Sequence, residues 1–328
     1  MVITQTPFRM SFFGGGTDFP DFYNEYGGSV ISTTFDKYCM VSVGHLPRFF
    51  EYSNMITYSR IERTNSADEI EHPAVRNAMK YLEIRMSYEA DLPARSGLGT
   101  SSSFAVGMLN GFYALKGKYV DKKKLAEDAI YLERVLCEES GGVQDQIAAA
   151  YGGFNRIDFS KDGFIVTPLI IPNERKRELN GNLMLFFTGF SRYASDIEIS
   201  RKKAMKDKTK ELKEMLALVD DAQNVLVSKG SLNEFGRMLD HTWKLKRGIT
   251  NKISNDSIDA VYKRAVEAGA LGGKLLGAGG GGFMLFYVEK DKQDNVRKEL
   301  EDLLYVPFEF ENGGTRIMYY NAEEYDIL

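Results

Sequence analysis

The chain contains 328 residues, of which 43% are hydrophobic and 27% charged, and its formal net charge is −4. This composition is typical of a soluble enzyme or binding protein with one large domain or two smaller ones, and the charge gives no reason to expect a nucleic acid or an anionic membrane as partner. Two distant cysteines and three scattered histidines argue against a disulfide framework and structural zinc. The N-terminus does not resemble a signal peptide, and no apolar run approaches the roughly 18 residues of a membrane span, so a cytoplasmic protein is expected.

The N-terminal segment is expected to form a strand that leads into a glycine turn. Residues 2–13 are largely apolar, and the chain then reads Gly-Gly-Gly-Thr-Asp at residues 14–18. Residues 29–43 alternate between apolar and polar side chains, with Asp36 and Lys37 near their middle. This pattern predicts a β-hairpin that turns near Asp36.

A second glycine-rich loop follows residues 84–90, whose alternation predicts a strand. The loop contains Pro93, Gly97, Leu98, Gly99, Thr100, Ser101, Ser102 and Ser103. Apolar residues then recur at helical spacing, so the layout is strand, glycine loop and helix. The N–H groups at such a helix N-terminus can bind a phosphate, because glycines let an anion approach the main chain and the helix dipole favours negative charge. An ordinary capped turn is the alternative, and the spacing is not that of a Walker P-loop.

Two acidic residues, Glu133 and Asp145, stand out in the next segment. Asp121 can cap a helix, and Glu133 lies on the half-buried side of that helix. A carboxylate there needs a partner, unless it reaches water at the edge of the buried face. Asp145 lies in the first turn of a short helix that follows Gly141 and Gly142. Taken alone, Asp145 is explained as a favourable first-turn residue.

The composition changes near residue 180. A buried strand is expected at residues 182–187, and a long helical stretch with many lysines and acids follows at residues 196–227. Further helices are expected at residues 232–247 and 257–268. A third glycine-rich segment then contains Gly277, Gly279 and Gly280. Glycines lose much conformational entropy on ordering, so this segment favours a backbone that lies against another surface, with a flexible hairpin tip as the alternative.

Three glycine motifs in this order resemble those of the galactokinase, homoserine kinase, mevalonate kinase and phosphomevalonate kinase (GHMP) superfamily, and the middle one reads Gly-Leu-Gly-Thr-Ser-Ser-Ser. The resemblance runs from Pro7 to the end of the sequence. It implies an α+β fold of two domains with the active site between them. Residues 1–180 would form an N-terminal domain like the second domain of ribosomal protein S5, and residues 181–328 a ferredoxin-like C-terminal domain.

Within the superfamily, the sequence looks most like the bacterial D-glycero-D-manno-heptose kinases. The likeness rests on Pro-Phe-Arg at residues 7–9, Gly-Gly-Val-Gln-Asp-Gln at residues 141–146 and Lys-Leu-Leu-Gly-Ala-Gly-Gly-Gly-Gly-Phe at residues 274–283. Those enzymes phosphorylate the anomeric oxygen of heptose 7-phosphate, for nucleotide-activated heptose and surface polysaccharide. The Gly-Gly-Gly-Thr-Asp at residues 14–18 differs from the Gly-Glu-His-Thr-Asp of galactokinases and argues against galactose.

The resemblance also implies the catalytic groups and the cofactors, ATP and Mg2+. Asp145 matches the catalytic carboxylate, and Arg9 would lie beside it. Glu133 matches the glutamate that holds Mg2+ together with a loop serine, here Ser101 or Ser102. A non-catalytic sugar or nucleotide sensor on the same fold would be expected to lack this acid pair, and it remains an alternative beside a superfamily decarboxylase and kinases of other sugars, such as fucose.

The ligand contacts follow in the same way. ATP phosphates would lie on the loop formed by Pro93 and residues 97–103, with Gly277, Gly279 and Gly280 on the other side. Thr17, Asp18 and Gly142 would contact the sugar. A phosphate on the sugar would need basic residues, for which the candidates are Arg48, Arg192, Lys244 and Arg247. The implied partner is a small-molecule sugar phosphate, with no nucleic acid and no membrane, and a homodimer is left open.

Overall fold

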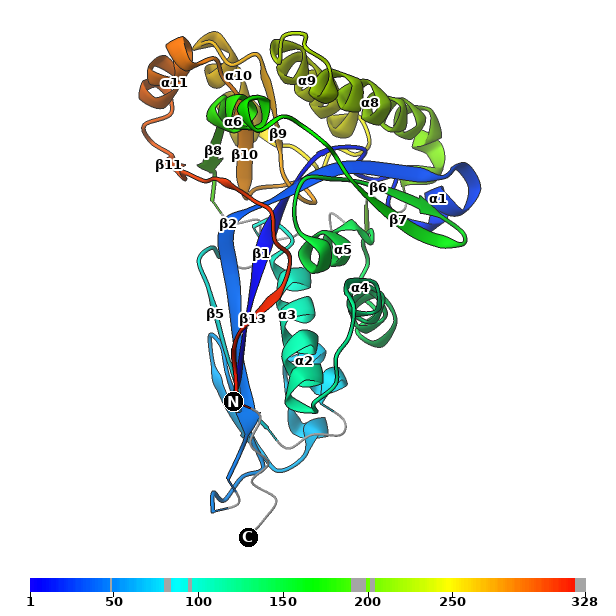
Figure 1. The fold of residues 1–328 in the computed structure, drawn as a ribbon. Helices are drawn as coiled ribbons and strands as arrows, with labels where there is room; N and C mark the ends of the chain where they lie inside the picture. The colour runs from blue at the N-terminus through cyan, green and yellow to red at the C-terminus, as the bar shows by residue number, and fades with distance from the viewer. Residues whose placement is uncertain (48, 80–83, 94–95, 190–198, 201–203, 322–328) are drawn as a thin grey trace.

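A computed structural model describes residues 1–47, 49–79, 84–93, 96–189, 199–200 and 204–321. The chain forms a large and a small β-sheet with helices packed on both (Figure 1). The small sheet and its helices lie at one end of the molecule, and the large sheet extends away from them toward the N-terminus (Figure 1). Within these ranges no helix combines the length and the apolar character that a bilayer crossing requires.

The large sheet has the strand order β13-β1-β2-β5-β3-β4, with β6 and β12 also paired to β2 and β7 paired to β6. Its pairs are antiparallel except for β3 with β5. Its strands are β1 (Val2–Phe13), β2 (Gly28–His45), β3 (Asn54–Thr57), β4 (Ile61–Thr64), β5 (Ile84–Ala90), β6 (Asn155–Ser160), β7 (Gly163–Pro168), β12 (Phe310–Glu311) and β13 (Arg316–Tyr320).

The hairpin expected at residues 29–43 is wrong, because β2 is one continuous strand that pairs with β1. Pro7 pairs with Tyr38, whereas Phe8 pairs with Phe35, so Asp36 and Lys37 form a bulge between the two registers. The Asp36 N–H donates to the Glu309 carbonyl at 2.9 Å instead of to the sheet partner. Turn-forming residues in this strand therefore mark a β-bulge and not a reversal of the chain.

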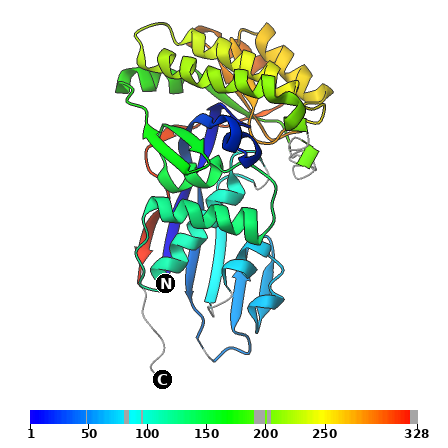
Figure 2. The ribbon, with the colours of Figure 1, turned by 90° about the vertical axis from the view of Figure 1, so that its right-hand side faces the viewer.

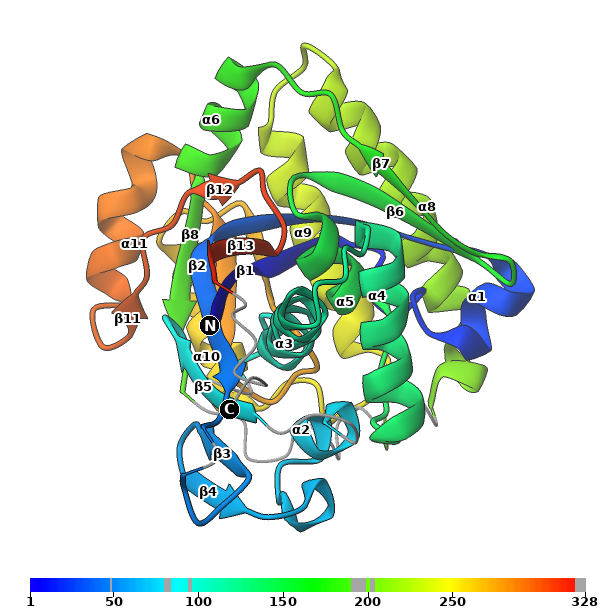
Figure 3. The same cartoon turned by 60° about the horizontal axis from the view of Figure 1, so that its bottom comes forward.

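Helices cover one face of the large sheet, and α3 lies along β1 and β2 (Figure 3). Thr4 Oγ1 donates to the Gly107 carbonyl of α3 at 3.0 Å, which ties the helix to the sheet. The helices before β8 in the chain are α1 (Pro20–Tyr26), α2 (Pro73–Ala78), α3 (Thr100–Leu115), α4 (Lys122–Tyr131), α5 (Gln144–Tyr151) and α6 (Asn173–Gly181), with the short turns η1 (Ala67–Glu69) and η2 (Leu132–Leu136). Of these, α6 lies against β8 of the small sheet (Figure 1).

The small sheet has the order β11-β8-β10-β9, and the long helices α8 and α9 lie beside it (Figure 2). The strand expected at residues 182–187 and the helices expected at residues 232–247 and 257–268 are confirmed, the last with Asn255 accepting the Ile258 N–H at its N-cap. Of the helix expected at residues 196–227, residues 209–227 are helical, and residues 196–198 and 201–203 lie outside the described ranges. The elements are β8 (Leu183–Phe187), η3 (Met205–Lys208), α8 (Thr209–Val227), α9 (Asn233–Arg247), α10 (Asp256–Glu267), β9 (Gly272–Leu275), β10 (Phe283–Tyr287), η4 (Lys290–Lys292), α11 (Gln293–Glu299) and β11 (Leu304–Tyr305).

The chain crosses back to the large sheet after β11. Strand β12 pairs with β2, and β13 pairs with β1 at the edge of the sheet. The large sheet thus contains residues from both sides of the domain boundary expected at residue 180, and that boundary stays a prediction.

Candidate active site

A cavity of about 560 Å³ lies where the two sheets meet. Its wall combines the ends of β1 and α3, the first turn of α5 and the loop after β9. The lining includes Arg9, Asp18, Glu133 and Asp145 from the N-terminal half, and Lys246 and Lys274 from the C-terminal half. Several groups that the sequence places far apart therefore face one cavity.

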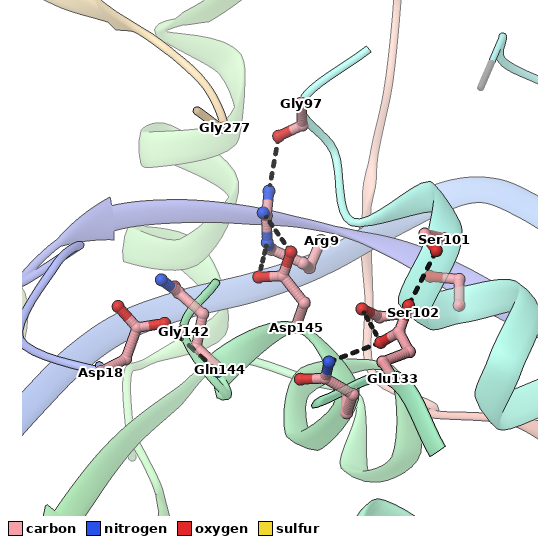
Figure 4. Close-up of polar contacts among 12 residues, drawn as sticks. Arg9, Asp18, Gly97, Ser101, Ser102, Glu133, Gly142, Gln144, Asp145 and Gly277 are labelled. Carbon is pink, nitrogen blue, oxygen red and sulfur yellow. Dashed lines mark hydrogen bonds and ion pairs between the residues drawn. The ribbon is translucent and has the colours of Figure 1, made fainter. Parts of the chain in front are cut away.

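Arg9 and Asp145 form a two-pronged ion pair on the wall of this cavity (Figure 4). Arg9 Nε donates to Asp145 Oδ1 at 2.8 Å, and Arg9 Nη2 donates to Oδ2 at 2.7 Å. Nη1 donates to the Gly97 carbonyl at 2.7 Å. The Arg9 side chain is 6% exposed and that of Asp145 is 23% exposed, so the carboxylate stays accessible to a ligand. Arg9 thus fixes Asp145 in one orientation and connects it to the glycine loop.

The glycine loop ends at Gly99, which is the N-cap of α3 and has a φ of 72°. Among the residues that the structure describes, no side chain caps the helix, so the alternative of an ordinary capped turn is wrong. A Cβ on Gly99 would lie 3.2 Å from Arg9 Cγ and 3.4 Å from Asp145 Oδ2, so it would press on the Arg9 side chain, and the φ of 72° favours glycine at this position. The first N–H groups of the 16-residue helix α3 therefore meet the cavity with no side-chain partner from the described part of the chain, as phosphate-binding helix ends do.

The hydroxyl groups that follow Gly99 make two kinds of contact. Ser101 Oγ and Ser102 Oγ donate to the two carboxylate oxygens of Glu133, at 2.7 and 2.6 Å (Figure 4). Ser103 Oγ instead donates to the Pro7 carbonyl at 3.0 Å and holds α3 on β1. Thr100 lines the cavity, and Leu98 is buried in the core with its carbonyl accepting the Arg9 N–H. The expected loop residues thus include both lining and anchoring groups.

Glu133 is 1% exposed, so the alternative that it reaches water is wrong. It lies in the π-helical turn η2 that follows α4, and such turns often occur at functional sites. Gln146 Nε2 also donates to Glu133, in addition to the two serines. Burial, with Glu133 as a second cause, raises the pKa of the neighbouring Glu139. Among the residues that the structure describes, no ion pair includes Glu133, so its charge is held by neutral donors alone.

Asp18 lies at the first glycine turn and is almost fully buried. The Gly16 N–H donates to its Oδ1 at 2.9 Å, and the Gln144 N–H donates to its Oδ2 at 3.3 Å. A Cβ on Gly142 would lie only 1.9 Å from Asp18 Oδ2, so Gly142 packs directly against the carboxylate. The structure therefore brings Asp18 and Gly142 together beside Asp145.

Thr17 has a different place. Its hydroxyl oxygen lies 2.8 and 2.9 Å from the Gly14 and Ser29 carbonyl oxygens, which share its one proton, and it accepts the Ser29 N–H. The side chain is fully buried and lies outside the described lining of the cavity. Thr17 thus holds the glycine turn together, and its contact with the sugar stays a prediction.

The third glycine segment meets the phosphate loop, as expected for a backbone that lies against another surface. A Cβ on Gly97 would lie 2.4 Å from the Leu276 carbonyl oxygen, and a Cβ on Gly282 would lie 2.3 Å from the Ser96 carbonyl oxygen. Gly277 lines the cavity, whereas Gly279 packs on Ile253 and the Gly280 N–H donates to the Ile253 carbonyl. Pro93, Gly279 and Gly280 are not part of the described lining.

Two of the basic residues expected to hold a phosphate on the sugar lie away from the described lining of the cavity. Lys244 and Arg247 pair with Asp240 and Asp259 outside the described lining, and Arg48 and Arg192 lie outside the described residues. Lys246, Lys274 and Arg134 line the cavity instead, and sequence reasoning did not assign them a role. The position of Lys274 next to the third glycine motif is the one sequence signal that could have indicated a role in the site. The residues around Lys246 give no sequence signal that distinguishes it from Lys244.

Comparisons with known proteins find relatives along most of the chain. The family described as GHMP kinases N terminal domain matches residues 68–153, and the family described as GHMP kinases C terminal matches residues 203–306. A D-glycero-alpha-D-manno-heptose 7-phosphate kinase from Campylobacter jejuni is 32% identical over 313 residues, which cover 90% of this chain and 92% of that protein.

Two further relatives extend the comparison. An L-fucokinase/L-fucose-1-P guanylyltransferase from Bacteroides fragilis is 32% identical over 222 residues, which cover 65% of this chain and 23% of that larger protein. The crystal structure of a D-glycero-D-manno-heptose 1-phosphate kinase from Bacteroides thetaiotaomicron is similar in fold, with a TM-score of 0.80 and 24% identity over 98% of this chain and 100% of that one. The expected two-domain α+β fold is confirmed. The chain belongs to the GHMP kinases, a family of ATP-dependent phosphotransferases.

Proposed function

We propose that this kinase transfers the terminal phosphoryl group of ATP to the anomeric hydroxyl of D-glycero-D-manno-heptose 7-phosphate. The observation that carries the proposal is the ion pair of Arg9 with Asp145, which faces the same cavity as the uncapped N-terminus of α3. The choice of sugar rests on the Campylobacter jejuni relative, which shares 32% identity along 90% of the chain. A cytoplasmic location and the oligomeric state stay predictions.

Asp145 is the proposed general base. Its carboxylate would accept a hydrogen bond from the anomeric hydroxyl and take the proton as the new bond from oxygen to phosphorus forms. The transition state of phosphoryl transfer is loose, so orientation and charge contribute more than covalent chemistry. Arg9 contributes both, because its two parallel hydrogen bonds orient Asp145 and its charge lies near the transferred group.

The loop before α3 is the proposed ATP phosphate site. The backbone N–H groups after Gly99 would donate to phosphate oxygens. Gly97 and Gly99 allow the loop its φ values of 85° and 72° and its close packing against Leu276 and Arg9. Gly277 would close the opposite side of the site, since it already contacts Gly97.

The donor set around Glu133 fits Mg2+. A buried carboxylate with two hydroxyl groups offers the oxygen ligands that Mg2+ prefers, and Mg2+ usually completes its shell with water and substrate phosphates. Glu133 with Ser101 or Ser102 would hold the ion, which would offset charge on the ATP phosphates. Gln146 would keep the Glu133 carboxylate oriented through its amide.

Asp18 is the proposed contact for sugar hydroxyls, with Gly142 shaping the space beside it. Its carboxylate is oriented by the Gly16 and Gln144 N–H groups and lines the cavity next to Asp145. A carboxylate so held can accept hydrogen bonds from two neighbouring hydroxyls. We therefore expect Asp18 to contribute to sugar binding more than to turnover.

The proposal is tested by ADP release with heptose 7-phosphate, the free heptose, fucose, galactose and mevalonate. We expect turnover with heptose 7-phosphate and a product whose new phosphate is on the anomeric carbon, as read by phosphorus NMR. Asp145→Asn serves as the control for contaminating kinases. Turnover of an unphosphorylated sugar alone would overturn the heptose 7-phosphate assignment, and absence of turnover with every compound would favour a sensor.

A further inference from the structure

Two buried polar side chains in the wall of the cavity have unused hydrogen-bonding groups. Ser11 and Gln144 are each 8% exposed, and both line the cavity. Within the described part of the chain, neither Ser11 Oγ nor Gln144 Oε1 forms a hydrogen bond. Buried polar atoms without a partner are rare in native proteins, because leaving such an atom unpaired costs free energy. The position of both residues in the lining points to a bound ligand as the partner.

Strand β1 turns Ser11 to the same side as Arg9. The four residues 8–11 pair with β2 without a shift of register, so side chains two positions apart share a face. Arg9 faces the cavity, whereas Phe8 and Met10 on the opposite face are fully buried in the core. Ser11 therefore lies on the cavity face of the strand, two residues after the proposed partner of the catalytic base.

Gln144 is the first residue of α5 and directly precedes the proposed base, Asp145. Its N–H donates to Asp18 Oδ2 at 3.3 Å, and the N–H of Val143 donates to the Asp18 carbonyl at 3.1 Å. The backbone that carries Gln144 is thus fixed on the proposed sugar contact. The Gln144 side chain therefore starts from a point that is held beside both Asp18 and Asp145.

Both side chains adjoin the parts of the backbone that hold the Asp18 carboxylate. The Gly16 N–H donates to Asp18 Oδ1 at 2.9 Å. Its neighbour Gly15 lies beside Ser11, since a Cβ on Gly15 would be 4.0 Å from Ser11 Oγ. Ser11 is thus close to the turn that holds one carboxylate oxygen, and Gln144 belongs to the backbone that holds the other.

The chemistry of these groups selects the kind of ligand. An amide oxygen only accepts hydrogen bonds, and so does an ionised carboxylate, so the partner of Gln144 Oε1 and Asp18 must donate. A phosphate dianion has no proton to donate, and the Asp18 carboxylate repels it. A hydroxyl group donates and accepts, which suits Gln144, Asp18 and Ser11 alike. The three side chains together fit a ligand with several hydroxyl groups.

We propose that Ser11 and Gln144 bind hydroxyl groups of the sugar and form, with Asp18, a subsite that selects a polyhydroxylated acceptor. The inference rests on the proposed kinase function and adds two specificity-determining residues to it. A site that hydrogen-bonds a substrate hydroxyl rejects an analogue without that hydroxyl, because buried polar groups are then left unpaired. Ser11 and Gln144 would in this way discriminate against acceptors with fewer hydroxyls, such as mevalonate.

Calorimetric titration of the full chain with heptose 7-phosphate, free heptose and the imido analogue of ATP tests the proposal. Ser11→Ala and Gln144→Leu remove the hydrogen-bonding groups with little change in size. Ser29→Ala is the matched control. Ser29 Oγ is likewise buried and has no hydrogen-bond partner among the described residues, but Ser29 lies outside the described lining of the cavity. Melting temperatures establish that the variants are folded.

We expect Ser11→Ala and Gln144→Leu each to weaken heptose 7-phosphate and free heptose by the same factor of at least about 5, which corresponds to the loss of one hydrogen bond. The ATP analogue should weaken by less than about 2-fold, because the phosphate loop is untouched. Ser29→Ala should leave the affinity for all three ligands unchanged.

A second measurement uses the wild-type chain and monodeoxy forms of heptose 7-phosphate, so it does not depend on the folding of a variant. At least one monodeoxy form should bind at least about 5-fold more weakly than the parent sugar. That deficit should disappear in the variant that lacks the contacting side chain, because the two changes remove the same hydrogen bond.

Three results would overturn the inference: equal wild-type affinity for every monodeoxy form, variants with unchanged sugar affinity, and variants in which sugar and ATP analogue weaken alike. A loss confined to heptose 7-phosphate would overturn it too, since it would assign the side chains to the phosphate. Failure of the proposed function looks different, because the wild-type chain itself then binds no heptose. If the wild type binds another sugar instead, the same comparison with that sugar and its deoxy forms decides the inference.

Discussion

Gly97 and Gly277 lie back to back where the two halves of the molecule meet, and a Cβ on Gly277 would lie 2.2 Å from the Gly97 Cα. The contact joins the loop that opens α3 to the loop that follows β9. The Gly97 carbonyl also accepts a hydrogen bond from Arg9. A shift of the contact between the two glycines would therefore displace Arg9 and the Asp145 carboxylate that Arg9 holds.

Gly277→Ala is expected to lower turnover by about 100-fold, the loss that accompanies a displacement of catalytic groups by about 1 Å. The new Cβ would collide with the Gly97 backbone, which has no rotamer to relieve the clash, and φ at Gly277 is 76°. Gly117→Ala is the control, because its φ of 64° is similar but no atom lies within 4 Å of the new Cβ. Steady-state kinetics and melting temperature measure both, and equal losses in the two variants would contradict the role of the contact.

Asp145→Asn is expected to lower kcat by at least roughly 100-fold, the usual contribution of a general base. Binding of ATP should change little, because the phosphate loop keeps its own backbone donors. Fluorescence titration of a nucleotide analogue beside the ADP assay separates the two effects. An Asn variant with near-normal kcat would refute the assignment of Asp145.

Glu133→Gln is expected to raise the Mg2+ concentration needed for half-maximal activity, because an amide offers a weaker oxygen ligand than a carboxylate. Glu127→Gln in α4 is the control, since Glu127 is exposed and only weakly paired with Lys123. The measurement is a Mg2+ titration at fixed ATP. If the Mg2+ titration curves of Glu133→Gln and the wild type coincide, Glu133 is not a ligand of the metal ion.

Gly142→Ala is expected to raise the KM for the sugar by about 10-fold or more, a loss comparable to one charged hydrogen bond, with the KM for ATP nearly unchanged. The Cβ would overlap Asp18 Oδ2 and push the carboxylate away from the Gln144 N–H. Gly230→Ala, with only Ser228 Oγ nearby at 3.5 Å, is the control. A larger effect on ATP than on sugar would argue against the sugar contact of Asp18.

His72 is expected to make stability depend on pH. It is packed between the rings of Tyr58 and Phe104, and burial lowers its pKa from 6.5, with a smaller opposing effect of Glu62. The unfolded chain therefore takes up a proton more readily, so this contribution to the free energy of unfolding is complete above pH 6.5 and is lost as the pH falls below 6.5 through the folded pKa.

Melting temperatures from about pH 7.5 down to about pH 5.5 test this, with His72→Gln as the comparison. The variant should lose less stability than the wild type over the acidic part of that range. Parallel curves for the two proteins would show that another group determines the acid sensitivity.

The local motifs of the site could be predicted from the sequence, because each glycine loop and its flanking strand or helix are encoded within a few residues. Arg9, Glu133 and Asp145 were identified by likeness to a family, and only the structure places Ser101 and Ser102 on Glu133. Their catalytic and metal-binding roles stay predictions.

Non-local features could not be predicted. Lys246 and Lys244 lie in the same helix, but Lys246 faces the cavity and Lys244 faces solvent. The difference arises because α9 packs against the loop after β9, a contact between segments that are far apart in the sequence. Asp36 and Lys37 have turn-forming composition, and the distinction between a turn and a bulge depends on pairing with β1 and on a hydrogen bond to Glu309. The sequence alone suggests Thr17 as a contact for the ligand, and only the structure shows that its hydroxyl bonds to the Gly14 and Ser29 carbonyls.

The pairing of β13 with β1 has a consequence for biosynthesis. Strand β1 carries Arg9, and its outer neighbour in the sheet is formed by residues 316–320, which are made more than 300 residues later. A nascent chain therefore exposes the open edge of β1 at residues 2–5 until residues 316–320 have emerged from the ribosome. Emergence of this segment, more than synthesis of the motifs themselves, would time the appearance of a folded kinase.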